Sequence, residues 1–462
     1  MRLFGYHLRR MTVFFCFLEA MIVGAAFIAV AQIVAPVSIP ASGLLYAIEI
    51  AAAPIGMLFL SLIAFGAYNI DVMQSPRIVA PRVVAAAVLG GAGLTFFYLI
   101  GIGSVLSPVE MIVAELLAVP AIILGRTGLR HLTAVPALST RALVLGTGRR
   151  ASDVWAALAD DRLGRLAGFV SGSMDGTNQT EAVPKAQIIP RNDRLASIAL
   201  ENSAGQIVIA LDEQRGALPT EELLECRMQG IAVHNISTFL ERETGQVDLE
   251  TMRASWLVFD EGFSSGRLTN ALKRCLDIAA SLGLLIFFAP LMLLTALAVR
   301  LDSRGPIFYR QTRIGLGGEP YEIVKFRSMV QDAEQNGKAQ WAVKRDPRIT
   351  RIGAILRKSR LDELPQAFNV LSGEMSFVGP RPERPEFVAQ LAEQIPYYNE
   401  RHRVKPGITG WAQINYPYGA SVEDARKKLK YDLYYVKNKS LVFDLLTMLQ
   451  TVRIILFAEG AR

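Results

Sequence analysis

RKSRLDELPQAFNVLSGEMSFVGPRP, residues 357–382, concentrates most of the chemistry of this sequence. A carboxylate pair, Asp362 and Glu363, lies between Arg357 on one side and Arg381 on the other. A carboxylate can attack phosphorus or bind Mg²⁺, and guanidinium groups bind phosphate oxygens through paired hydrogen bonds. Prolines on both sides of Arg381 restrict the backbone that carries it. The pattern therefore indicates phosphate chemistry, with a helix carrying surface ion pairs as the simpler alternative.

Five motifs in a fixed order extend this pattern over residues 265–462. They are KFRSM (325–329), SRLDELPQ (359–366), SFVGPRPE (376–383), KPGITGWAQIN (405–415) and YDLYYVKNKSLVFDL (431–445). In this order they resemble the bacterial sugar transferases, the polyprenyl-phosphate glycosyl-1-phosphate transferases that start exopolysaccharide and O-antigen repeats. The rest of the chain is similar in layout to large members of that family, which carry several membrane helices and a Rossmann-like middle region.

The resemblance implies an enzyme that transfers a sugar-1-phosphate from a UDP-sugar to undecaprenyl phosphate and releases UMP. Asp362 is implied as the nucleophile that forms a covalent aspartyl-phosphosugar intermediate. Glu363 is implied as its catalytic partner and as a ligand of Mg²⁺, with Asp362 beside the metal. We expect four cationic side chains to contact the substrate phosphates, and these are Lys325, Arg327, Arg357 and Arg381. Each of them could form a surface ion pair instead.

Three further residues are candidates for binding the nucleotide or the sugar: Arg384, Trp411 and Gln413. Trp411 and Gln413 belong to the segment 405–415, whose Pro-Gly pair and later glycine are typical of a binding loop. An indole ring could stack on uracil or a sugar, or it could anchor the loop in the core. The sequence does not separate these two roles for Trp411.

The composition points to a membrane-associated protein. Apolar residues make up 51% of the chain and gather in its first quarter. The net charge of +7 suits an anionic membrane surface or phosphorylated substrates. No basic stripe alternates with exposed aromatic residues, so we expect no nucleic-acid partner. The three cysteines and four histidines are far apart, which indicates neither a disulfide framework nor a zinc site.

Four apolar segments lead the sequence, at about 11–34, 45–68, 83–103 and 109–125. Each is close to the ~20 residues that a helix needs to span the lipid bilayer. Arginines precede the first segment, join the second to the third and follow the fourth, whereas the other two connections contain no Lys or Arg. By the positive-inside rule both ends of the region 1–130 are cytoplasmic. We therefore predict a multi-pass protein of the bacterial cytoplasmic membrane whose soluble domains are cytosolic.

Four acidic residues lie in or at the ends of these segments: Glu19, Glu49, Glu110 and Glu115. Acidic side chains within a membrane are functional candidates by default. Positions near the interface or hydrogen bonds between helices explain them more simply, and we favour that interpretation.

Residues 137–250 alternate between strand and helix patterns. Apolar runs such as RALVLG (141–146) and QIVIAL (206–211) are separated by helical stretches, which predicts a Rossmann-like parallel sheet. GTGRRA (146–151) approximates the dinucleotide fingerprint, but the acid expected after the second strand is absent. A partial fingerprint alone is weak, so we favour a regulatory or structural role for this domain over catalysis.

The apolar run 278–299 is the fifth segment that could span a membrane, being about 33 Å long as a helix. Both of its ends are basic, and Pro290 lies near its middle. Proline removes a backbone donor and disfavours helical geometry before it. These features predict a re-entrant helix hairpin at 272–301 that breaks at Pro290, and the family resemblance implies the same. We expect this hairpin to begin an α/β-containing catalytic domain at 265–462.

A second hypothesis is a catalytically inactive membrane scaffold or regulator of polysaccharide assembly, with a Rossmann-like domain that senses a ligand. The retained carboxylate pair and the five motifs favour the enzyme. The sequence does not identify the sugar, the ligand of the middle domain or the oligomeric state, for which a homodimer is one option. For the last segment, 431–457, a helix lying at the membrane interface and an ordinary amphipathic helix on its own core remain equal alternatives.

Overall fold

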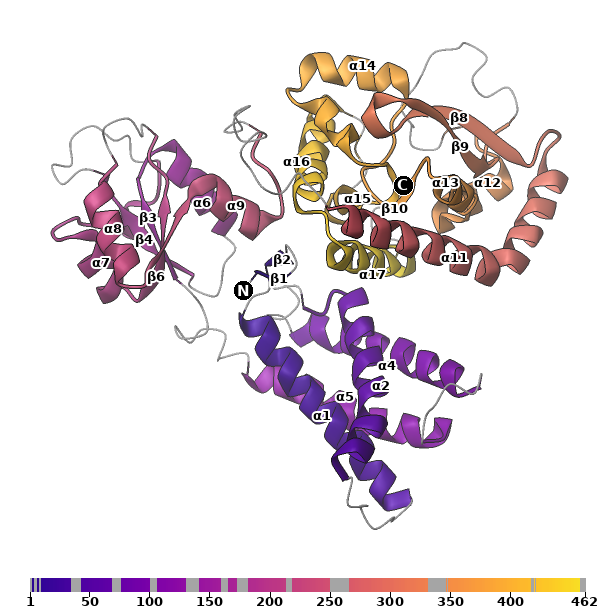
Figure 1. Ribbon diagram of the computed structural model, residues 1–462, viewed down its shortest axis with the longest axis horizontal. Coiled ribbons are helices and arrows are strands. Elements are labelled where there is room, and N and C mark those ends of the chain that lie inside the picture. Colours follow the sequence, from indigo (N-terminus) through magenta and orange to yellow (C-terminus); the bar gives the residue numbers. More distant parts are fainter. Residues whose placement is uncertain are drawn as a thin grey trace.

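The computed structural model describes residues 2–3, 6–7, 10–34, 43–68, 76–99, 106–129, 141–158, 165–172, 182–212, 218–249, 266–330, 346, 348–416, 419 and 421–457. They form three groups of elements. Figure 1 shows a helical bundle at the bottom, a helix-flanked sheet at the left and a mixed α/β unit at the right. We call these the N-terminal bundle (10–129), the middle region (141–249) and the C-terminal region (266–457).

The N-terminal bundle consists of four apolar helices, as the sequence predicts. They are α1 (Arg10–Val34), α2 (Gly43–Ala64), α4 (Pro76–Leu99) and α5 (Pro108–Gly128), preceded by the short strands β1 (Arg2–Leu3) and β2 (Tyr6–His7). Each helix packs against two others, so the four form a closed ring around an apolar core. By length and composition, α1, α4 and α5 could cross a membrane, and the described part of α2 is also apolar.

A buried ion pair connects the helices of the bundle. Arg126 of α5 donates through Nε to Glu19 of α1 and through Nη1 to the carbonyl of Ala67, 2.7 Å away. Glu19 also accepts from the hydroxyl of Tyr68 at 2.6 Å. Glu19 therefore bonds between helices, the interpretation that the sequence favours. Arg126 is only 3% exposed, so its charge is neutralised inside the bundle and does not flank the helix in solvent.

Two other acidic residues of the bundle also have local partners. Glu110 forms a capping box with Ser107 at the start of α5. Glu115 lies close to the backbone of α4, where a side chain at Gly91 would collide with its carboxylate. The side chain of Glu49 is outside the described residues.

The middle region contains a five-stranded parallel sheet with helices, in the order β5-β4-β3-β6-β7. Its elements are β3 (Arg141–Leu145), α6 (Arg149–Leu158), β4 (Leu166–Val170), η2 (Lys185–Gln187), β5 (Ile188–Ile189), α7 (Leu195–Glu201), β6 (Ala204–Ile209), α8 (Thr220–Met228), β7 (Ala232–Asn235) and α9 (Ile236–Thr244). This strand order is that of the first five strands of a doubly wound sheet. Apolar side chains of β3 and β6 are fully buried between the helices.

The glycine-rich turn between β3 and α6 is filled from within the chain. The carboxylate of Asp212, just after β6, accepts hydrogen bonds from the backbone N–H groups of Arg149 and Arg150, at 3.0 and 2.9 Å. A Cβ at Gly148 would lie 1.9 Å from an oxygen of Asp212, so this close approach requires glycine. Asp212 thus occupies the helix N-terminus at which a dinucleotide phosphate would bind.

The C-terminal region begins with one long helix and a β-hairpin. Its elements are α11 (Arg267–Asp302), β8 (Phe308–Ile314), η4 (Leu316–Gly318), β9 (Pro320–Phe326), α12 (Arg351–Ser359), η5 (Leu361–Glu363), α13 (Gln366–Ser372), β10 (Ser376–Val378), α14 (Pro385–Gln394), η6 (Tyr398–Arg403), β11 (Gly407–Thr409), α15 (Trp411–Asn415), α16 (Val422–Asn438) and α17 (Leu441–Phe457). β8 and β9 are antiparallel, whereas β10 and β11 form a short parallel pair.

α11 is continuous, with Pro290 inside it, so the predicted break into two helices is not confirmed. Figure 1 shows the helix bent along its length, as expected of a helix with an internal proline. Both of its ends are bound to the same C-terminal region. Near the start, Lys273 pairs with Asp444 at 2.6 Å, and at the end Asp302 accepts from the backbone N–H of Ile352 at 3.2 Å.

The middle of α11 exposes a large apolar surface. Its exposed side chains are Leu282, Ile286, Phe287, Leu291, Leu293, Leu294 and Leu297. By length and composition α11 could cross a membrane. The last helix, α17, contacts both α11 and α2 of the N-terminal bundle, so it lies between the C-terminal region and the bundle.

The middle region contacts the C-terminal region through α9 and the residues after it. Glu241 of α9 forms a buried ion pair with Lys437 of α16, at 2.7 Å. The backbone N–H of Val247 donates to the carbonyl of Lys430 at 3.0 Å. Helix α16 therefore carries a junction between the two regions.

Replacing Asp212 with Ala tests the internal cap of α6. The substitution leaves two N–H groups of the first helical turn without their acceptor, so we expect a loss of about 1–2 kcal/mol in local stability. Faster amide exchange of the first turn of α6 in the full-length protein, measured by mass spectrometry, is the expected result. Glu225→Ala, which removes an exposed ion pair with Arg194, serves as the control and should leave α6 unchanged. Equal exchange in both variants would contradict the assignment.

Candidate active site

The carboxylate pair lies in a tight turn between two helices. α12 ends at Arg360, which adopts the left-handed conformation with φ 56° and ψ 17°. The 3₁₀ turn η5 follows and carries Asp362 and Glu363, both of which are buried. A left-handed residue reverses the chain at a helix end, and this reversal directs η5 toward β9. The two carboxylates are therefore presented by a short, constrained turn.

Three cations from different segments surround Glu363. Its Oε1 accepts from Lys325 Nζ of β9 at 2.9 Å and from Arg381 Nη2 at 2.8 Å. Its Oε2 lies 3.8 Å from Nη1 of Arg360. Ion pairs with this degree of burial are screened much less than pairs on the surface. The structure thus brings together four of the candidate residues: Asp362, Glu363, Lys325 and Arg381.

The two carboxylates differ in their affinity for protons. Burial raises the pKa of Asp362 to about 6, although Lys325 lowers it. Burial also raises the pKa of Glu363, but Arg381 and Lys325 outweigh that effect and hold it well below its ordinary value. Neighbouring carboxylates with separated pKa values are typical of acid, base and nucleophile pairs. Glu363 is therefore a fixed anion, and Asp362 titrates near neutrality.

Two other candidates approach this cluster to different degrees. Arg357, in the last turn of α12, is near enough for its charge to lower the pKa of Asp362. Arg381 keeps 34% of its side chain exposed while bound to Glu363, so its guanidinium can also meet a ligand. The expected phosphate contacts of both remain predictions.

Arg327 and Arg384 make their contacts elsewhere. Nη2 of Arg327 donates to the carbonyl and hydroxyl of Ser303, at 2.6 and 2.9 Å, and so caps the end of α11. Among the described residues, its guanidinium makes no hydrogen bond or ion pair with the two carboxylates. Arg384 is the N-cap of α14 and lies 3.5 Å from Glu386. In this structure neither residue joins the cluster around Glu363, and their substrate contacts stay predictions.

Trp411 is buried at the junction with the middle region. Its indole N–H donates to the carbonyl of Gly245 at 2.9 Å, and its ring stacks on Tyr434 and meets the edge of Phe443. Of the two roles that the sequence allows, this arrangement favours the anchor. Gln413 donates to the carbonyl of Ile408 at 3.3 Å, while its Oε1 is buried without a partner in the described structure.

Three arginines that are not among the expected phosphate contacts bind Glu363 or the backbone around Arg381. Arg360 contacts Glu363 directly, and Arg313 of β8 donates to the carbonyl of Pro382 at 3.3 Å. Arg401, in η6, donates to the carbonyl of Arg381 at 2.8 Å. Only Arg360 carried a local signal, because it adjoins the carboxylate pair in sequence. The other two reach the site through long-range folding that no motif spacing encodes.

Two substitutions of Arg360 measure how much its left-handed backbone conformation lowers the stability of the protein. Arg360→Gly and Arg360→Ala both remove the pair with Glu363, but only glycine adopts φ 56° without strain. We expect the glycine variant to be more stable than the alanine variant by roughly 0.5–1 kcal/mol. Unfolding in detergent, followed by circular dichroism, measures the difference. An alanine variant as stable as the glycine variant would show that the turn carries no such strain.

Comparison with known proteins identifies the C-terminal region. The profile of the family described as "Bacterial sugar transferase" matches residues 268–458. A UDP-N-acetylgalactosamine-undecaprenyl-phosphate N-acetylgalactosaminephosphotransferase of Aeromonas hydrophila is 44% identical over 240 residues, which are 52% of this chain and 56% of that protein. A UDP-glucose:undecaprenyl-phosphate glucose-1-phosphate transferase of Escherichia coli (strain K12) is 44% identical over 187 residues, 40% of each chain.

A shorter relative is matched over nearly its whole length. The exopolysaccharide production protein PSS of Rhizobium leguminosarum bv. phaseoli is 46% identical over 187 residues, which are 39% of this chain and 93% of that protein. The match to the Aeromonas protein, in contrast, spans only about half of that relative. Because the matched segment holds Asp362, Glu363 and their cations, the chain belongs to the bacterial sugar transferase family.

Proposed function

We propose that this protein transfers a sugar-1-phosphate from a UDP-sugar to undecaprenyl phosphate and so initiates an exopolysaccharide or related glycan. The observation that carries the proposal is the buried pair of carboxylates, Asp362 and Glu363, in which Glu363 is paired with Lys325 and Arg381. The relatives from Aeromonas hydrophila and Escherichia coli are named for this kind of transfer.

In the first step an oxygen of Asp362 attacks the phosphorus that bears the sugar. The bond between this phosphorus and the bridging oxygen breaks, UMP leaves, and the sugar phosphate remains esterified to the aspartate. In the second step an oxygen of the lipid phosphate attacks the same phosphorus. The bond to Asp362 then breaks, which restores the carboxylate and releases the lipid-linked sugar. The UDP-sugar and the lipid phosphate thus react one after the other at the same residue, Asp362.

Positive charge is the main requirement of this reaction, since an anion must approach a diphosphate. Lys325 and Arg381 are fixed by Glu363 before substrate arrives, so their orientation costs little at the moment of reaction. Arg381 is the more exposed of the two and is the proposed contact to a phosphate oxygen. Arg357 is proposed to act from α12 on the same group.

Mg²⁺ is the proposed cofactor, and the donor set fits it. In proteins this ion is commonly held by one or two carboxylates together with substrate phosphates. In the described part of the chain no three acidic, His or Cys side chains gather at one place, so a site built from protein ligands alone is not found there. Oε2 of Glu363 is 3.8 Å from its nearest cation and is the freer of its two oxygens. Glu363 with Asp362 would hold the ion, which neutralises phosphate charge when bound.

The proposed site lies at the cytosolic face of the cytoplasmic membrane, where UDP-sugars are available. Support comes from α11, whose two ends bind the same C-terminal region while its middle exposes apolar side chains. A helix that crossed the bilayer would place its ends about 30 Å apart on opposite sides of the lipid. We therefore keep the re-entrant arrangement as a proposal, with the bend of α11 entering one leaflet only.

The alternative of an inactive scaffold with a ligand-sensing middle domain receives less support. Asp212 occupies the turn at which a dinucleotide phosphate would bind. The carboxylate pair and its cations, in contrast, have the arrangement that a transferase needs.

Asp362→Asn tests the covalent step. The amide is a poor nucleophile, so we expect UMP release to fall at least about 1000-fold. With wild-type protein, UDP-sugars, Mg²⁺ and no lipid acceptor, mass spectrometry should find a sugar phosphate on the peptide that contains Asp362. Glu322→Gln, an amide substitution at an exposed carboxylate, is the control. Full turnover by Asp362→Asn would end the mechanism, and a wild type inactive with every UDP-sugar would favour the scaffold.

The pH dependence of activity follows from the raised pKa of Asp362. The nucleophile must be ionised, so kcat/KM should be half-maximal near pH 6, reach a plateau about one pH unit higher and fall as the pH drops below 6. Arg357 lowers this pKa, and its removal in Arg357→Met should move the acid limb to higher pH. Arg310→Met removes an exposed arginine of β8 and should leave the limb in place. An identical limb in Arg357→Met and wild type would contradict the assignment.

A further inference from the structure

The segment 380–382, which carries Arg381, is fixed by hydrogen bonds that its backbone carbonyl groups accept. Pro380 and Pro382 have no N–H, so this part of the backbone offers few donors of its own. Its carbonyls are instead bound in succession by three separate elements. The N–H of Gly407 donates to Pro380 at 2.9 Å, Nη2 of Arg401 to Arg381 at 2.8 Å, and Nη1 of Arg313 to Pro382 at 3.3 Å.

Arg401 is one of the two arginines among these three donors, and a buried carboxylate holds its guanidinium in place. Its Nε and Nη2 lie 3.1 and 2.8 Å from Oδ2 of Asp432, a residue of α16. Its Nη1 donates to the hydroxyl of Tyr398 at 3.0 Å, and its guanidinium lies over the Tyr398 ring at 5.3 Å. Arg401 and Asp432 are 5% and 2% exposed, so the pair is shielded from water and salt.

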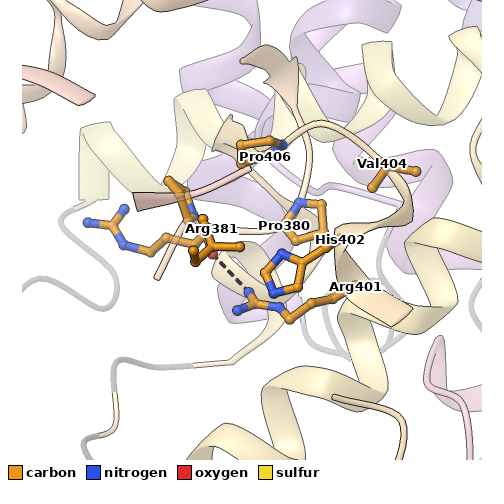
Figure 2. Close-up of a pocket in the computed structure, with 8 residues that line it drawn as sticks. Pro380, Arg381, Arg401, His402, Val404 and Pro406 are labelled. Atoms are coloured by element: carbon orange, nitrogen blue, oxygen red, sulfur yellow. Dashed lines mark hydrogen bonds between the residues drawn. The ribbon is translucent and has the colours of Figure 1, made fainter. Parts of the chain in front are cut away.

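The space behind the segment is tightly packed. Figure 2 shows Pro380, Arg381, Arg401, His402, Val404 and Pro406 around this space, with Arg401 directed at the carbonyl of Arg381. The gap between these side chains is too narrow for a water molecule. A water molecule therefore does not fit into this space beside Arg401.

We infer that Arg401, held by Asp432, is a positioning residue that fixes the backbone of Arg381 so that its guanidinium meets the substrate phosphate. The inference rests on the proposed function, because Arg381 is the proposed phosphate contact. Arg401 is itself buried behind the segment and does not reach the carboxylates in the described structure. Its effect on the reaction passes through Arg381.

A charged pair suits this role because its geometry is specific. Arginine offers donors in a rigid plane, so it can bind Asp432 and the Arg381 carbonyl at the same time, which lysine cannot reproduce. Replacing only one partner would leave the other as an uncompensated buried charge and could unfold the chain. The test therefore removes both charges together in Arg401→Met/Asp432→Leu, which preserves most of the buried volume.

The matched control is Lys437→Met/Glu241→Leu. It removes a second buried ion pair that also involves α16 but lies at the junction with the middle region. We expect both double variants to fold, as judged by thermal unfolding in detergent. Amide exchange should rise in residues 376–383 of the Arg401→Met/Asp432→Leu variant and stay as in wild type in the control.

Activity provides the second measurement. We expect kcat/KM for UMP release to fall about 10- to 100-fold in Arg401→Met/Asp432→Leu, with little change in the control. The same double change made in an Arg381→Met background should cost less than threefold more, because the group that it positions is already gone. A merely structural role predicts that the two losses multiply.

The outcomes separate this inference from the transferase proposal. Unchanged exchange in residues 376–383, wild-type activity of the Arg401→Met/Asp432→Leu variant, or losses that multiply would each overturn the positioning role. Faster exchange of the segment in a protein whose wild type releases UMP from no UDP-sugar would support the positioning of the Arg381 backbone and count against the proposed reaction. Should that variant not fold, Arg401→Lys, which keeps the charge, gives the same exchange and activity comparison.

Discussion

The ion cluster around Glu363 is the interaction on which the site depends. Lys325 comes from β9, Arg381 from the segment after β10 and Glu363 from η5, so one carboxylate joins three segments that are distant in sequence. Without that anion, buried cations would repel one another and lose their fixed directions. Burial, with a smaller contribution from the charge of Glu363, raises the pKa of Asp362, whereas Arg381 and Lys325 hold the pKa of Glu363 low.

The membrane sets the second constraint. Lys273 and Asp277 fix the start of α11 to α17 and β10, while Asp302 fixes its end to α12. Between residues 278 and 299 every exposed residue of the helix is apolar. Such a surface is stable only against lipid or another apolar surface. In the proposed re-entrant arrangement, attachment at both ends would let the bilayer orient the C-terminal region.

Local patterns in the sequence predicted the elements well, and predicted contacts between distant elements poorly. The apolar bundle and the parallel strands follow from the periodicity of apolar residues, which is a local property. Lys325 and Arg327 share a motif, yet one binds Glu363 and the other caps α11, because the strand ends between them. Asp212 fills a turn more than 60 residues before it. Such contacts form only in the folded chain, so the spacing of residues in the sequence does not predict them.

The start of α6 and the cluster around Glu363 both bind a carboxylate, but they differ in how far their positive groups are already neutralised. At the start of α6, both carboxylate oxygens of Asp212 accept hydrogen bonds from backbone N–H groups, those of Arg149 and Arg150. Around Glu363, one oxygen binds two cations and a third cation stands further off. Lys325, Arg360 and Arg381 carry one positive charge more than the two carboxylates can neutralise. This excess positive charge and the exposed part of Arg381 would favour an anion such as phosphate at the C-terminal site. In the middle region, the carboxylate of Asp212 already takes the place of such an anion.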